Sequence, residues 1–530
     1  MRTYVRPLVV LLLFAASLFA QSPIGTAFLV GDVTGGADTA PAVACEGTTG
    51  RHLVVWNASP AGTTAEVRGQ LVSATGALLG NQILFATDEV LGARPVVAAV
   101  RARGRFVVGW IVDLGGVLRP RFVAVDASTG AVSGTTTLTG QVGSGVTQMA
   151  LGGDSRVGVL GVGDNVLVAA RLQSQLSETV QTYALQVGAT GAPVLITGSG
   201  QTLASGDTYY HVALSEHGGT AGRWLVSFSR YDLFNGHITS NFVLNDNALP
   251  CVPTGVVFPI TTNHVSVATR DGNDFAAVVA GNGVLKVYPI TFTGACGAGT
   301  LSLGAPATIA SSPTSAVSDP EITFARDKYL VTWRSNTTLT SPGIVHVLGL
   351  DPTTCSTCSN TENVELTVVS QEQPVIAAQW SGSATANDEA LVVWSNGTIR
   401  ARRHEARGTG TVTSLGGSCG IQGLSDLNTY GGRPVLGDTT FRVEMASPTA
   451  PVLALVLGFA AAPIPCGPCT LVPSLDLLLP GVSPTPIPIP CAANLVGTEL
   501  FTQWLQLRTA GCPLLPDIGL SNTLRFTIGQ

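Results

Sequence analysis

Short runs of consecutive apolar residues that end in an aromatic side chain recur along most of the chain. The clearest copies occupy residues 53–56, 106–110, 224–228, 329–333 and 391–394. A short run that is apolar at successive positions is typical of a β-strand whose two faces are both buried. Because the runs return about every 50 to 60 residues, they predict an array of small, similar β-sheets.

Two weaker copies, at residues 166–169 and 275–279, have lost the aromatic residue and bring the number of units to seven. In several units a short strand precedes the run, and a strand that alternates between apolar and polar residues follows it. Three to four antiparallel strands per unit form the blade of a β-propeller. We therefore predict an all-β chain whose main part is a seven-bladed β-propeller, with six blades as the alternative because of the two weaker copies.

A short strand around residues 27–33 is expected to complete the last blade, which would close the ring and remove free sheet edges. The order Pro-x-Val-Ala, Leu-Val-Val-Trp and Ile-x-Gly within a unit resembles the divergent propeller-like repeats of large bacterial secreted proteins. The resemblance covers roughly residues 26–405. It implies the fold and very little about activity.

The first 20 residues have the pattern of a secretory signal peptide. Arg2 and Arg6 precede an apolar core at residues 8–19, and Ala20 is a small residue at a plausible cleavage point. The apolar core is shorter than the roughly 20 residues that a membrane-spanning helix needs. We expect a mature chain that is secreted or held at the cell surface, without an integral membrane segment, in which residues 22–407 form the propeller.

The composition changes after Arg407. A Gly/Thr/Ser-rich linker is expected at residues 408–415, and Pro, Leu and Cys become frequent in residues 416–530. Alternation at 441–445 and an apolar run at 453–457 predict a small C-terminal β-sandwich. This segment resembles the C-terminal domain shared by many exported proteins of planctomycete-type bacteria, which carries no assigned activity. The resemblance rests on the order of the motifs at residues 416–420, 432–437, 451–459, 486–490, 495–497, 501–504 and 519–522.

Ten cysteines suit an oxidising compartment, where thiols tend to pair. The candidate disulfide cysteines are the local pairs Cys355 with Cys358 and Cys466 with Cys469, and the more distant pair Cys251 with Cys296. The spacing at 466–469 is also that of a redox motif, but such chemistry needs a helix N-terminus, and the Pro-rich flanks predict none. A structural bridge is favoured, and no zinc site or other cofactor is expected because no second pair lies at finger spacing.

The sequence contains few motifs that indicate a catalytic, metal-binding or nucleic-acid-binding function. Charged residues are only 11% of the chain and the formal net charge is −6, which argues against nucleic acid as a partner. The seven histidines are scattered, no nucleophile or phosphate-binding motif is found, and residues 271–274 predict a hairpin turn rather than a calcium site. Five carboxylates in or near loops stay unranked: Asp113, Asp126, Asp164, Glu216 and Asp327.

One group of basic residues is a candidate binding site. Six arginines fall within one unit, and guanidinium groups bind carboxylates and sulfates in a bidentate manner, so an acidic polysaccharide could dock there. The alternative is that they are ordinary solvated charges of loops and outer strands. The six are Arg94, Arg101, Arg103, Arg105, Arg119 and Arg121.

These observations favour an exported noncatalytic protein that uses a propeller for binding or surface interaction, with an extracellular polysaccharide or a surface protein as partner. Two alternatives stay open. One is a propeller-fold polysaccharide hydrolase or lyase whose carboxylates come from separate blades and meet in the central channel. The other is a structural component of the cell envelope. Fold alone does not choose among them.

Overall fold

The computed structural model describes most of the chain from residue 23 to residue 529. The signal peptide expected at residues 1–20 lies outside the described part. The described residues are 23–31, 36–60, 65–87, 93–138, 145–156, 164–174, 177–206, 208–232, 236–251, 256–258, 264–281, 283–311, 316–325, 328–336, 343–351, 354–355, 357, 362–366, 374–379, 389–405, 410–416, 418, 427–438, 441–446, 448–467, 469–507, 512 and 518–529.

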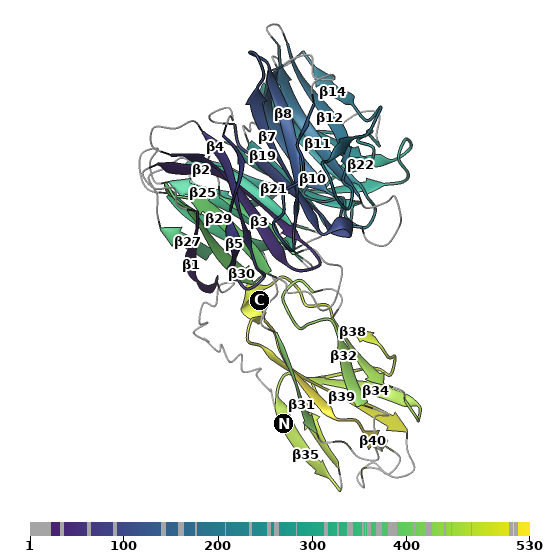
Figure 1. Cartoon of the computed structure of the whole chain (residues 1–530). Helices are drawn as coiled ribbons and strands as arrows, with labels where there is room; N and C mark the ends of the chain where they lie inside the picture. The colour runs from purple at the N-terminus through teal and green to yellow at the C-terminus, as the bar shows by residue number, and fades with distance from the viewer. Residues whose placement is uncertain are drawn as a thin grey trace.

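Seven antiparallel sheets make up the larger part of the molecule (Figure 1). Listed from the inside outward, the first four are β2 (Ala37–Glu46), β3 (Arg51–Ser59), β4 (Glu66–Val72), β5 (Leu78–Ala86); β6 (Val96–Val100), β7 (Arg105–Asp113), β8 (Leu118–Asp126), β9 (Thr136–Thr137); β10 (Gly145–Gly153), β11 (Asn165–Gln173), β12 (Glu178–Gln186), β13 (Val194–Leu195) with β14 (Gln201–Ser205); and β15 (Thr208–Leu214), β16 (Trp224–Asp232), β17 (Gly236–Leu244), β18 (Val256–Phe258). The other three are β19 (His264–Thr269), β20 (Asp274–Gly281), β21 (Val284–Thr293), β22 (Thr300–Leu303) with β23 (Ala307–Ser311); β24 (Ala316–Ala325), β25 (Lys328–Asn336), β26 (Gly343–Leu350), β27 (Glu362–Leu366); and β28 (Val375–Ala378), β29 (Glu389–Ser395), β30 (Ile399–Glu405) with β1 (Pro23–Gly31).

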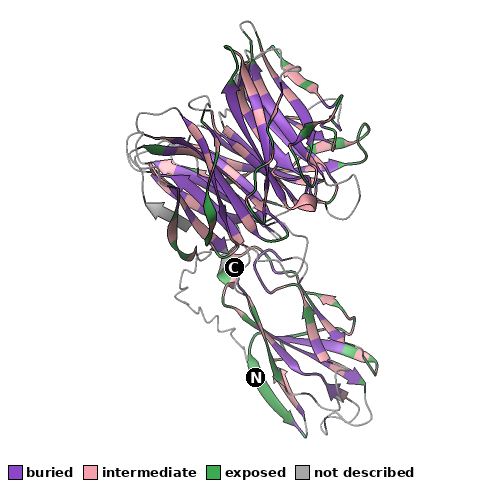
Figure 2. Cartoon of the chain, in the orientation of Figure 1, coloured by how far each residue is buried: buried purple, intermediate pink, exposed green. Residues whose placement is uncertain are grey.

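The first strand of each sheet packs against the first strand of the next, and β28 packs against β2, so the seven sheets form a closed ring. This is the predicted β-propeller, and the number of blades is seven. The runs that revealed the repeat are the second strands, which are buried on both faces between neighbouring blades (Figure 2). The side chains of Trp56, Trp110 and Trp394 in these strands are fully buried.

Ring closure comes from the N-terminal strand. β1 pairs antiparallel with β30 and becomes the outer strand of the seventh blade, as predicted, although it begins and ends earlier than residues 27–33. Val30 packs into the core between the seventh and first blades, where Trp56 also lies. A Cβ atom at Gly31 would be 2.5 Å from the Trp56 ring, so only glycine allows this approach of backbone to indole.

The C-terminal part is a separate β-domain with its own core around Trp504, which completes the predicted fold class. Its main sheet has the order β31 (Thr411–Gly416), β41 (Thr523–Thr527), β39 (Glu499–Leu507), β34 (Val452–Gly458), β37 (Leu477–Pro480), with β40 (Ile518–Leu520) beside β39. A smaller sheet holds β32 (Leu427–Gly431), β33 (Arg442–Ala446) and β38 (Thr485–Pro486), and β35 (Ala461–Cys466) forms a hairpin with β36 (Cys469–Pro473).

The linker expected at residues 408–415 needs a correction. Residues 411–415 belong to β31, which pairs with β41 of the C-terminal sheet. The Gly/Thr/Ser composition suggested a linker, but Val412 packs against the C-terminal core and anchors this strand.

Two disulfides join cysteines that are distant in the sequence. Cys251 pairs with Cys296 and ties the fourth blade to the fifth. Cys466 pairs with Cys512 rather than with Cys469, which faces it across the β35–β36 hairpin. Cys355 is a free, buried thiol, so the predicted bridge from Cys355 to Cys358 is wrong. Its side chain packs among apolar residues of the core between the fifth and sixth blades. Cys358 lies outside the described residues.

No helix in the described part of the chain has the length and apolar character needed to cross a membrane.

Candidate functional site

The centre of the ring encloses a cavity of about 420 Å³. All seven first strands contribute to its lining, because the free edge of each one faces the axis. Much of the wall is aliphatic, as in Val43, Leu151 and Ile376. The size and the few convergent polar groups are those of ordinary ligand pockets, which hold about 300–1,000 Å³. The polar side chains are Arg94, Thr147, Gln148, Arg171, His211, Glu216, His264, Ser266 and Glu321.

Irregular backbone directs three of these side chains into the cavity. Gln148, His211 and Glu321 each stand directly after a register shift in a first strand. The shift before Glu321 includes Asp319, whose φ is +56°, in the left-handed region. Such β-bulges redirect a side chain without ending the strand, and they are common next to binding sites.

Two histidines from adjacent blades form one wall. The rings of His211 and His264 are 5.3 Å apart between centroids, and Nε2 of His264 lies 3.7 Å from an oxygen of Asp319. The pKa of His211 is lowered to about 3, mainly by burial and in addition by electrostatic repulsion from His264, Arg94 and Arg171, so His211 is neutral at physiological pH. Its Nδ1 has no hydrogen-bond partner among the described residues, which leaves this atom to a ligand.

The two cavity arginines are held by different contacts. Arg94 donates from Nε to the carbonyl oxygen of Pro41 at 2.9 Å. Arg171 makes two hydrogen bonds to Glu178, at 2.8 and 3.2 Å, and Glu178 also accepts a bond from the backbone N–H of Tyr209. Arg171 is therefore paired with a carboxylate, although its charge still lowers the pKa of His211, and Arg94 lowers the pKa of Glu321 across the cavity.

Two carboxyl groups reach the cavity from different blades. Glu216, just after β15, accepts hydrogen bonds at Oε1 from the backbone N–H of Phe324, at 3.3 Å, and from the hydroxyl of Thr323. Glu321 lies on the same strand as Thr323, two residues earlier. Burial is the main cause that raises the pKa of both groups, that of Glu216 to about 8. Perturbed carboxyl groups in a cleft are typical of functional sites.

A polar layer lies around Glu216. A smaller cavity of about 40 Å³ is lined by Glu216, Arg101, Ser155 and His217, among others. His217 accepts a hydrogen bond at Nδ1 from the backbone N–H of Gly219 at 3.1 Å, and burial lowers its pKa to about 3.

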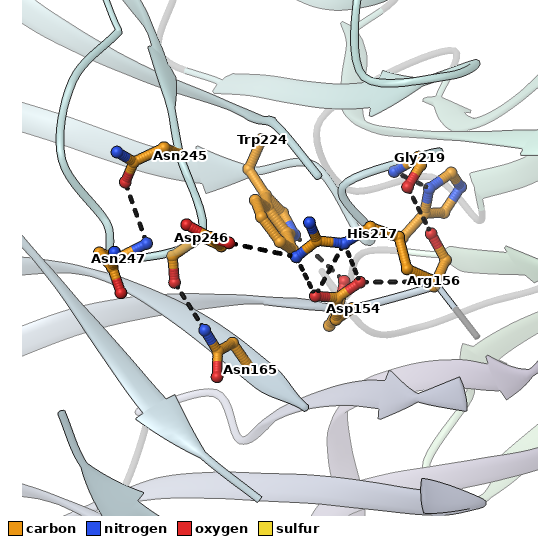
Figure 3. Close-up of polar contacts among 11 residues, drawn as sticks. Asp154, Arg156, Asn165, His217, Gly219, Trp224, Asn245, Asp246 and Asn247 are labelled. Atoms are coloured by element: carbon orange, nitrogen blue, oxygen red, sulfur yellow. Dashed lines mark hydrogen bonds and ion pairs between the residues drawn. The ribbon is translucent and has the colours of Figure 1, made fainter. Parts of the chain in front are cut away.

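Next to this layer, a charge cluster joins the third and fourth blades (Figure 3). Arg156 bonds both oxygens of the buried Asp154, at 3.0 and 2.6 Å, and lies 3.6 Å from Asp246. Trp224 donates from its indole N–H to the carbonyl oxygen of Gly153 at 3.1 Å. These groups satisfy one another, so this cluster supports the wall and offers no ligand site.

The structure does not gather the six predicted arginines into one patch. Arg94 lines the central cavity and Arg101 the smaller one. Arg103 pairs with Asp164, and Arg105 is buried, donating to the carbonyl oxygens of Gly188 and Gly191. The other two, Arg119 and Arg121, are on the third strand, β8. Ligand binding by this set stays a prediction.

The predicted loop carboxylates also separate. Asp113 and Asp126 accept hydrogen bonds from backbone N–H groups of their own turns, and Ser128 with Thr129 lowers the pKa of Asp126 to about 2. Asp164 is the partner of Arg103, and Asp327 lies outside the described residues. Of the four carboxylates that the structure describes, only Glu216 reaches the central cavity. Sequence reasoning missed Glu321, Gln148, His211 and His264 as members of one site, because each lies on a different blade.

The C-terminal domain has a shallower groove between β31, β32 and β41. Ser414, Asn428, Tyr430 and Asn522 line it, and Tyr430 is 46% exposed. Asn428 and Asn522 use their amides on neighbouring groups, so the groove offers mainly an aromatic ring.

No cluster of three or more metal-ligating side chains occurs among the described residues. No protein-family model and no curated protein matches the sequence. Among solved structures, the chain is similar to an α-L-arabinofuranosidase of Fusarium graminearum, with 8% identity, a TM-score of 0.37, and coverage of 72% of this chain and 98% of that one. It is also similar to the hemagglutinin-neuraminidase ectodomain of parainfluenza virus 5, with 7% identity, a TM-score of 0.38, and coverage of 73% and 86%. With identities of 8% and 7% and TM-scores of 0.37 and 0.38, these likenesses assign no activity to this chain.

Proposed function

We propose that the protein is an exported binding protein whose central cavity holds a terminal unit of an extracellular polysaccharide. The observation that carries the proposal is the cavity of about 420 Å³ into which every blade contributes and where donors and acceptors converge. The predicted signal peptide supports export, and two disulfides suit an oxidising compartment.

The chemistry of the lining fits a neutral or weakly charged sugar. A sugar ring presents hydroxyl groups that donate and accept hydrogen bonds, and it presents apolar C–H faces. Gln148 offers its amide N–H groups, since its Oε1 already accepts a hydrogen bond from the backbone N–H of Val212 at 3.1 Å. His211 offers Nδ1, Glu321 accepts, and aliphatic residues such as Val265 cover the remaining wall. Because Arg171 is paired with Glu178 and Arg94 acts on Glu321, the cavity lacks the concentrated positive charge that a polyanion requires.

The test is retention of the full chain on a glycan array and on immobilised polysaccharides. The variant Gln148→Ala with His264→Ala should bind at least tenfold more weakly, because two polar contacts in the cavity are lost. Gln186→Ala, at an exposed end of β12, is the matched control and should bind like the wild type.

Two results would contradict the proposal. One is undiminished binding by the double variant. The other is loss of binding on Tyr430→Ala alone, which would move the ligand to the groove of the C-terminal domain. Absence of retention on every glycan would favour the structural cell-envelope alternative.

A further inference from the structure

We infer that the central cavity hydrolyses a glycosidic bond, with Glu216 as the proton donor and Glu321 as the base that activates water. The inference rests on the proposed saccharide site. It assigns to this site a substrate class, glycosides, and two catalytic residues.

Two hydrogen bonds fix the orientation of the Glu216 carboxyl group. Its Oε1 accepts hydrogen bonds from the backbone N–H of Phe324 and from the hydroxyl of Thr323. These contacts occupy one carboxyl oxygen and leave Oε2 to carry the proton. The side chain is 29% exposed, and Glu216 lines both cavities.

The two carboxyl groups are connected through one strand. Thr323 and Glu321 are two residues apart on the regular part of β24, so their side chains leave the same face about 7 Å apart. Glu216 is bonded to Thr323, and both glutamates line the central cavity. An acid and a base that leave room for a water molecule, as in inverting glycosidases, have carboxyl groups roughly 6.5–9.5 Å apart, and this is the spacing that the inference requires.

The surroundings favour different protonation states. The pKa of Glu216 is raised to about 8, mainly by burial and to a smaller extent by the charge of Glu321, which keeps this group protonated. Burial also raises the pKa of Glu321, but Arg94 and a hydrogen bond with Ser266 favour its charged form. Arg94 and Ser266 thus act on Glu321 and not on Glu216, and this difference in surroundings suits Glu321 to the role of base.

Other titratable groups face Glu216. His217 is 3.7 Å away and neutral, and Arg101 and Cys45 share the smaller cavity with it. Burial raises the pKa of the Cys45 thiol well above its ordinary value, so this group stays uncharged. Arg101 is thus the one cation facing Glu216 within the smaller cavity's described lining.

The reaction balances with water as the only co-reactant. Glu216 gives its proton to the glycosidic oxygen as the bond from that oxygen to the anomeric carbon breaks. Glu321 takes a proton from the water whose oxygen forms the new bond to the anomeric carbon. The products are the free sugar and the alcohol. The proton on Glu321 returns to Glu216 through solvent.

The experiment uses the full chain with 4-methylumbelliferyl and methyl glycosides of neutral hexoses and pentoses. General acid and general base groups each contribute about 10²–10⁴-fold. Glu216→Gln should slow the methyl glycoside about 10³-fold but the umbelliferyl glycoside only about tenfold, because an aryl leaving group needs little protonation. Glu321→Gln should slow both about 10³-fold, since water activation is needed in both reactions.

The control is Glu66→Gln, the same substitution on β4, the third strand of the first blade, which should leave both rates unchanged. Gln at position 216 can still accept the bonds from Phe324 and Thr323, so the fold and glycan retention should persist. Retention of glycans with no product from any glycoside would overturn the hydrolysis and leave the binding proposal standing. Rates that are insensitive to both substitutions would also overturn it. Absence of both retention and product would overturn both proposals.

Discussion

Glu216 should make the stability of the propeller depend on pH, and Glu216→Gln should remove that dependence. The pKa of a glutamate is about 4.5 when exposed, and burial raises that of Glu216 to about 8. The folded chain therefore binds this proton more tightly than the unfolded chain between these two values. The resulting stabilisation is fully present below about pH 4.5 and is lost as the pH rises through about 8.

The size of the effect follows from the two pKa values. Each pKa unit of difference corresponds to about 1.36 kcal/mol, so the full contribution is roughly 5 kcal/mol. Because the side chain is 29% exposed toward the cavities, we expect about 3–5 kcal/mol. A propeller of this length unfolds with an entropy of about 0.8 kcal/mol per kelvin, so the melting temperature should change by about 5 °C.

Differential scanning calorimetry of the full chain between pH 5 and pH 9 measures this change in melting temperature. The wild type should lose about 5 °C more across the range than Glu216→Gln, while Glu66→Gln should follow the wild type. Other titrating groups are common to the three proteins, so the difference between curves isolates Glu216. Parallel curves for wild type and Glu216→Gln would refute the reasoning, because they would mean that Glu216 is ionised at neutral pH in the folded protein.

Three further predictions concern the fold. Val30→Asp should lower the free energy of unfolding by several kcal/mol, because it places an unpaired charge in the core at the ring closure. The control, Leu29→Asp, changes a side chain that is 46% exposed and should alter the free energy of unfolding by less than about 0.5 kcal/mol. Equal effects of the two variants in chemical denaturation would argue against closure by β1. Replacing Cys251 and Cys296 by Ser opens a loop with a sequence separation of 45 and should lower the free energy of unfolding by about 4 kcal/mol. Cys45→Ser is the control. A melting temperature that is unchanged in the double variant would contradict the bridge. Stability should also fall as the pH drops below about 6.5, because the unfolded chain then binds protons that four buried histidines of the folded chain do not. Burial lowers the pKa of His52, His211, His217 and His404. In the same calorimetric series, His217→Asn should show a shallower fall than the wild type.

The architecture could be predicted from the sequence because the repeat survives where packing demands it. The second strand of each blade is covered on both faces, so its apolar run is kept even where the aromatic residue is lost. Ala169 and Val279 occupy the same strand as Trp56 in their own blades, and the register with the third strand is regular in each case. Strand position is set by the backbone ladder and the apolar run, and the tryptophan adds volume to the core.

The arginine patch was a weaker inference, and the sequence held a signal against it. Arg121 stands opposite Trp110 across β7 and β8. Arg68 and Arg400 stand in the same way opposite Trp56 and Trp394. An arginine that recurs at one position of the repeat belongs to the blade rather than to one ligand site.

The cavity could not be predicted in the same way, because its members depend on contacts between distant blades. Glu216 was among five unranked carboxylates, and its partner Thr323 is 107 residues away in the sequence. A strand period indicates which residues share a face within one blade. It does not indicate which residues of seven blades meet at the axis.

Three polar residues of the cavity stand directly after breaks in strand regularity. Of the four first strands with a register shift before the cavity, three place Gln148, His211 or Glu321 directly after it, and the fourth, β2, places Ala42 there. The strands β6, β19 and β28 pair without a shift. A bulge weakens the ladder, so packing alone does not favour it. Its presence before Gln148, His211 and Glu321 is therefore better explained by the site than by the fold. It argues that the function of this propeller is carried by the irregular first strands together with positions next to them, such as Glu216.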